Sequence, residues 1–95
     1  MAQVATNVSA QIDWLIERLR LHIAEANEAE REWHALGDLE RLEYIHEWPL
    51  TLSHLEVLND YLSAWSPTLN QQQGYRWLTL ELERLQPFLN RVLRA

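Results

Sequence analysis

The amino-acid sequence predicts an all-α protein in which three long helices fold up, down and up into one bundle. Three stretches carry apolar residues at steps of three and four, the spacing that lines one face of a helix. Two glycines and three prolines in 95 residues are too few for the frequent turns of an all-β chain. The stretches have similar lengths and short connections, which favours antiparallel neighbours.

The first predicted helix covers about residues 9–36, and residues 1–8 are expected to form a flexible segment ahead of a single bundle domain at 9–95. Asn7 or Ser9 is expected to cap the helix start. Gly37 is expected to end it in the left-handed conformation, and Asp38 to cap the next helix. The apolar stripe consists of Ile12, Leu15, Ile16, Leu19, Ile23, Ala26, Trp33 and Leu36.

The second predicted helix covers about residues 39–65 and contains Pro49, which removes one backbone hydrogen bond. We expect a kink or a brief interruption there. A true break, with Ser53 and Glu56 as a fresh capping box, would give a four-helix domain instead. Pro67 ends this stretch, because the residue before a proline avoids helical geometry. The stripe consists of Leu42, Ile45, Trp48, Leu52, Leu55, Leu58, Leu62 and Trp65.

The third predicted helix covers about residues 68–94, with Thr68 and Gln71 spaced as a capping box at its start. Gly74 weakens the first turns by roughly 1 kcal/mol relative to alanine. Pro87 is expected to kink the last part. The stripe consists of Tyr75, Leu78, Leu82, Leu85, Leu89 and Val92.

Acidic residues are concentrated around the predicted hairpin between the first two helices. Residues 25–47 hold eight acids and two arginines, a balance of −6 that equals the net charge of the whole chain. We expect the third helix to bring Arg84, Arg91 and Arg94 back to this pole and to neutralise part of it. The pole is then a solvated surface or a docking patch for a basic protein. Its members are Glu28, Glu32, Asp38, Glu40, Glu43 and Glu47.

Motifs for catalysis or for cofactor binding are lacking, so we expect no enzyme and no cofactor. The chain has no cysteine, no glycine-rich phosphate loop and no nucleophile elbow. Glu43 and His46 have the Glu-x-x-His spacing of metal-binding bundles, and Glu30 and His34 lie one helical turn apart. These four residues define the alternative hypothesis, a metal- or ligand-binding bundle. His22 and His54 are expected to lie near each other, as ordinary buried histidines or as a pH-responsive pair.

Five tryptophans suggest a protein-interaction surface. Some large apolar residues lie off the main stripes of helices one and three, where they either widen the core or contact a partner. These residues are Trp14, Leu21, Trp77, Leu80 and Phe88. We therefore predict a non-enzymatic interaction module that forms a homodimer or docks a protein partner.

Location and partners follow from charge and hydropathy. The acidic balance argues against nucleic-acid binding. Neither a signal peptide nor a membrane-spanning stretch is evident, so we expect a soluble, cytoplasmic protein. All eight basic residues are arginine, which favours a GC-rich bacterial or phage genome.

Overall fold

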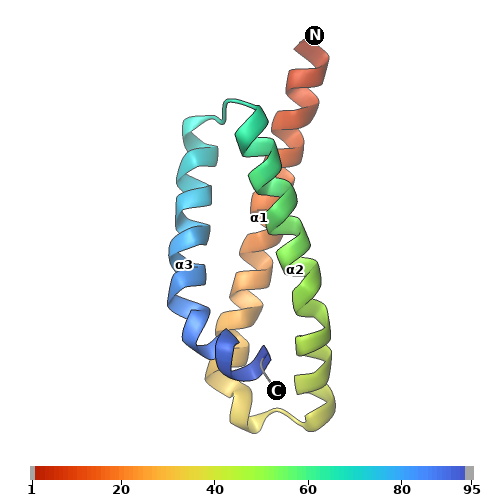
Figure 1. The fold of residues 1–95 in the computed structure, drawn as a ribbon, viewed down its shortest axis with the longest axis vertical. Coiled ribbons are helices and arrows are strands. Elements are labelled where there is room, and N and C mark those ends of the chain that lie inside the picture. Colours follow the sequence, from red (N-terminus) through yellow and green to blue (C-terminus); the bar gives the residue numbers. More distant parts are fainter. Residues whose placement is uncertain (1, 94–95) are drawn as a thin grey trace.

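Three α-helices run up, down and up in the computed structural model, which describes residues 2–93 and, within them, the side chains of residues 7–93 (Figure 1). Helix α1 spans Ala2–Glu32, α2 spans Asp38–Ala64 and α3 spans Leu69–Leu93. A short 3-10 helix, η1 (Trp33–Ala35), connects α1 to the turn before α2. The described residues contain no strand, so the predicted all-α three-helix bundle is confirmed.

Helix α1 is the centre of the bundle, because both α2 and α3 pack against it. Its stripe from Ile12 to Ala26 is buried, as the sequence predicts. Leu58 of α2 and Leu78 and Leu85 of α3 are also fully buried in this core. The molecule is elongated, measuring 50 × 21 × 18 Å, and the N-terminal end of α1 extends past the connection between α2 and α3 (Figure 1).

The ends of α1 differ from the prediction. Residues 2–8, expected to be a flexible segment, are helical in the structure. Asn7 and Ser9 therefore lie inside the helix and do not cap it. Gly37 does not take the left-handed conformation (φ −73°) and itself stands at the N-cap of α2. The chain leaves α1 through η1 instead, where the Leu36 amide donates to the Glu32 carbonyl at 3.1 Å.

Both helix-internal prolines are accommodated without a break. Helix α2 continues through Pro49, so the four-helix alternative is wrong for the described residues. One missing amide removes one hydrogen bond, and the buried side chains of Trp48 and Thr51 on either side hold α2 in place. Helix α3 also continues through Pro87, and its C-terminal part bends across the end of the bundle (Figure 1).

The start of α3 is fixed by the predicted capping box. The Thr68 amide donates to Gln71 Oε1 at 2.9 Å, and the Gln71 amide donates to Thr68 Oγ1 at 3.2 Å. The buried Gln71 side chain also donates to Ser9 of α1. A Cβ atom on Gly74 would lie 3.0 Å from Ile16 Cγ2. Gly74 therefore permits a close approach of α3 to α1 that offsets its low helix propensity.

The predicted stripe of α2 does not form one buried face. Trp48 and Leu58 are buried, whereas Leu42, Leu52 and Trp65 are exposed. Apolar residues surround most of α2, and packing on α1 buries only the side that carries Trp48, Thr51 and Leu58. Leu55 and Leu62 are partly buried against the core, and the exposed apolar residues of α2 remain in contact with solvent.

Candidate interaction surfaces

The predicted contact residues lie on two different sides of the bundle. Trp14 and Leu80 are 51% and 57% exposed, and Leu21 and Trp77 are exposed as well. The Trp14 ring contacts His54 of α2 edge-on, with ring centroids 5.7 Å apart. Trp77 of α3 instead lies beneath the Arg20 guanidinium, 5.4 Å from its ring centroid. Trp14 therefore belongs to the α1–α2 side and Trp77 to the α1–α3 side.

Phe88 was wrongly predicted to contact a partner. Its side chain is only 2% exposed, and its ring lies 5.5 Å from Trp33 and 6.4 Å from Tyr44. Phe88 lies three residues after Leu85 and four before Val92, both of which are buried, so it belongs to the buried face of α3. Phe88 therefore belongs to an aromatic cluster at the hairpin end, which also includes Trp48.

Two further apolar residues join Trp14 and Leu21 on the α1–α2 side. Leu50 and Val57 are both exposed, and they lie one helical turn before and after His54, the residue that Trp14 contacts. We call these four residues the outer patch. Sequence reasoning missed Leu50 and Val57 because they lie off the stripe that was taken to be the core of α2.

A pair of histidines borders the outer patch. The rings of His22 and His54 lie 5.8 Å apart, which confirms that these residues are neighbours. His54 Nδ1 is buried and has no hydrogen-bond partner among the described residues. Burial, followed by the nearby His22 and Arg18, lowers the pKa of His54. Arg18 also stacks over Trp14, with its guanidinium carbon 5.5 Å from the ring centroid.

Beyond the outer patch, the same two helix faces become acidic toward the hairpin. On α1, Leu21 is followed at steps of four, three and four by glutamates, and on α2, Leu50 is preceded by glutamates at steps of three, four and three. The glutamates surround a cleft of about 270 Å³ with Ala29, Leu36 and Tyr44 in its walls. We call it the acidic cleft. Its glutamates are Glu25, Glu28, Glu32, Glu40, Glu43 and Glu47.

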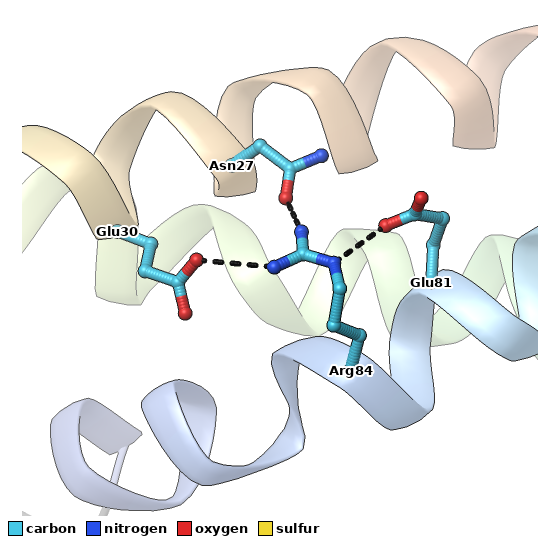
Figure 2. A network of polar contacts seen from close by, with 4 residues as sticks. All are labelled: Asn27, Glu30, Glu81 and Arg84. Carbon is cyan, nitrogen blue, oxygen red and sulfur yellow. Dashed lines mark hydrogen bonds and ion pairs between the residues drawn. The ribbon is translucent and has the colours of Figure 1, made fainter.

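The expected neutralisation of the acidic segment by α3 is confirmed for Glu30, but it does not extend to the glutamates of the cleft. Arg84 pairs with Glu30 at 3.3 Å and with Glu81 at 3.0 Å, and it also bonds Asn27, all on the α1–α3 side (Figure 2). Arg91 lines a different pocket, and Arg94 lies outside the described residues. No arginine lines the acidic cleft. Helix α3 packs on a different side of α1 from the cleft, so its arginines do not line the cleft.

Tyr44 lies at the inner wall of the acidic cleft. Its hydroxyl is buried without a hydrogen-bond partner among the described residues. Burial, and to a lesser extent Glu25, raises the pKa of this phenol far above its usual value. Tyr44 therefore stays neutral and adds no negative charge to the cleft. Asp38, expected in the acidic pole, does not line the cleft and lies 3.9 Å from Arg41.

The four candidate metal ligands do not converge. Glu30 and His34 line one pocket, Glu43 lines the acidic cleft, and His46 is exposed elsewhere on α2. Within the described part of the chain, no three histidine, aspartate or glutamate side chains form a group suited to a metal ion. The metal-binding form of the alternative hypothesis therefore loses the geometry on which it was based.

Comparison with known proteins gives no significant match. No family model, no curated protein and no solved structure matches the chain. Among the described residues, no helix combines the length and the apolar character that a membrane crossing requires. The interpretation of function therefore rests on the surfaces described above.

Proposed function

We propose that this chain is a non-enzymatic interaction module that docks a helix of a partner protein along the α1–α2 side. The observation that carries the proposal is the joint change along two adjacent helices from exposed apolar residues to glutamates. A partner helix lying along this side would contact the outer patch with its apolar face. Lysine or arginine residues at one of its ends would meet the acidic cleft.

The apolar character of the α1–α2 side supports a role at a protein–protein interface. Exposed apolar side chains clustered on one side, such as Trp14 and Leu50, are typical of such interfaces.

The charge of the cleft favours a basic partner over a second copy of this chain. Six glutamates line the cleft, and none of its lining residues is cationic. A second copy carries Arg41, Arg84 and Arg91 on or beside its α1–α3 side, and next to its own outer patch it carries Arg18, which already lies over Trp14. A partner with apolar and basic residues on one helix complements both parts of the surface.

Two synthetic peptides of about 20 residues, long enough to form a helix, test the proposal. They share a leucine stripe and differ at one end, which carries lysines in one peptide and glutamates in the other. We expect the lysine peptide to bind in isothermal titration calorimetry, with an affinity that decreases as salt increases. Trp14→Ala should weaken binding by roughly tenfold. The matched control Trp77→Ala should leave it unchanged.

The acidic cleft is tested with charge-neutral variants. Glu28→Gln combined with Glu47→Gln should weaken binding of the lysine peptide and reduce its salt dependence. The control pair Glu56→Gln and Glu83→Gln removes the same charge from exposed positions outside the cleft. Equal effects of the two pairs, or equal binding of the glutamate peptide, would contradict the proposal. A stable dimer that buries Trp14 would also contradict it, because the occupant would then be a second copy.

A further inference from the structure

A second pocket lies at the hairpin end, on the side of the aromatic cluster away from the acidic cleft. It has a volume of about 330 Å³ and is formed by α1, η1, α2 and the C-terminal part of α3. Its apolar walls come from Trp33, Ile45, Phe88 and Val92. Its polar lining consists of Glu30, His34, Arg41 and Arg91. We call it the arginine pocket.

Arg41 is held in place at the edge of this pocket. Its Nε donates to the Trp33 carbonyl at 2.9 Å, and its guanidinium carbon lies 5.7 Å from the Trp33 ring centroid. The Asp38 carboxylate approaches it only to 3.9 Å and is fully exposed, so this pair contributes little. The terminal nitrogens of the Arg41 guanidinium are thus available to bind a ligand. Their planar arrangement suits two hydrogen bonds to one carboxylate.

The carboxylate that lines the arginine pocket is already paired. Glu30 points toward Arg84, which does not line the pocket and which also pairs with Glu81 (Figure 2). Among the described residues Arg91 has no ion pair, and Arg41 has only the exposed Asp38 at 3.9 Å, so these two arginines give the lining its positive charge. The pocket is locally cationic in a chain whose net charge is −6.

We infer that the arginine pocket binds a small organic acid that carries an apolar group. The carboxylate would lie between Arg41 and Arg91, and the apolar group would pack against Trp33, Phe88 and their aliphatic neighbours. The pocket volume lies at the lower end of the range for small-ligand sites, and a few polar groups in an apolar wall are typical of them. This site is separate from the proposed docking surface.

The experiment uses three probes on the full chain: 4-phenylbutyrate, 4-phenylbutylamine and acetate. The amine keeps the apolar group and reverses the charge, and acetate keeps the charge without the apolar group. In two-dimensional NMR titrations up to about 5 mM, where a weak complex still forms, only 4-phenylbutyrate should shift the signals of Trp33 and Val92. Arg91→Gln should weaken its binding by about tenfold, and Arg76→Gln, an exposed change outside the pocket, should not.

Equal binding of the amine, unchanged binding by Arg91→Gln, or shifts confined to the acidic cleft would each overturn this inference. Arg41→Gln adds a second test, with circular dichroism as the control for folding, because Arg41 also bonds the backbone of η1. Binding of the lysine peptide to Arg91→Gln should remain unchanged. Failure of the acid to bind and failure of the peptide to bind are therefore separate results.

Discussion

The acidic cleft and the arginine pocket lie on two sides of the same hairpin and have opposite character. Six glutamates without a cation line the cleft, whereas two arginines and an already paired glutamate line the pocket. The rings of Trp33, Tyr44 and Phe88 lie between them, with centroids 5.5–6.4 Å apart. Helix geometry thus divides residues 25–47, whose charges sum to −6, between two surfaces of different chemistry.

This comparison shows why a charge total does not describe a surface. Glu28 and Glu30 are two residues apart in the sequence, yet they lie on different sides of α1 and line different cavities. The side on which α3 packs decides which of them receives an arginine. Four experiments test this separation, from the largest expected effect to the smallest.

Removal of one ring from the aromatic cluster should have the largest effect on stability. Phe88→Ala deletes a ring that is buried between the two sides, and we expect the free energy of unfolding to fall by about 3–5 kcal/mol. Urea denaturation measures this loss. The control Leu80→Ala, at an exposed position of the same helix, should change stability by less than about 0.5 kcal/mol. A loss below about 1 kcal/mol for Phe88→Ala would show that the aromatic cluster contributes little to the stability of the fold.

Tyr44→Phe tests the inner wall of the cleft. Burial and Glu25 raise the pKa of Tyr44, so folding favours the neutral phenol. Its contribution to stability is complete below the unfolded pKa of about 10 and decreases as the pH rises above that value. Tyr44→Phe should flatten this alkaline decline, and at neutral pH it should gain about 1 kcal/mol because the buried hydroxyl lacks a partner.

Urea denaturation at neutral and alkaline pH measures both effects of Tyr44→Phe. The control Tyr75→Phe removes a hydroxyl that bonds Asn59 at 2.6 Å, and it should retain the alkaline decline. A lower stability of Tyr44→Phe at neutral pH would indicate that its hydroxyl has a partner in solution.

Removal of charge from each side should act in opposite directions. Glu28→Gln and Glu47→Gln together should raise the free energy of unfolding by a few tenths of a kcal/mol at low salt, because the cleft glutamates repel one another. Arg84→Gln should lower it, since Arg84 pairs with Glu30 and Glu81. Both changes should diminish at high salt. Thermal denaturation at two salt concentrations provides the measurement, and changes of the same sign would refute the separation of charge.

The smallest effect should come from His54, at the border of the outer patch. Burial, His22 and Arg18 lower its pKa, so folding favours the neutral imidazole. Its contribution to stability is complete above the unfolded pKa of about 6.5 and decreases as the pH falls below that value. His54→Gln should therefore flatten the decrease in melting temperature toward acid pH, and His46→Gln, at an exposed position of α2, should not. Identical pH profiles of these two variants would exclude a role for the histidine pair.

The sequence by itself determined the helices and their order. Periodicity of three and four, the Thr68–Gln71 capping box and Pro67 are local signals, and the structure follows them. The buried stripe of α1 was also predictable, because its apolar residues recur at steps of three and four and both α2 and α3 pack against this helix. Pro49 was ambiguous, since one lost hydrogen bond kinks or breaks a helix according to how the flanking residues pack.

Only the tertiary structure decided which apolar and charged residues meet solvent. An up-down-up order allows α3 to pack on either side of the first hairpin, and this choice leaves the acidic cleft without arginines and forms the arginine pocket. Helix α2 is apolar on several sides, so contact with α1 decides that Leu58 is buried and Leu50 is exposed. Contact with Trp33 and Tyr44 of the hairpin likewise buries Phe88, whereas Leu80 of the same helix is exposed. These outcomes depend on contacts between segments far apart in the chain, which local periodicity does not encode.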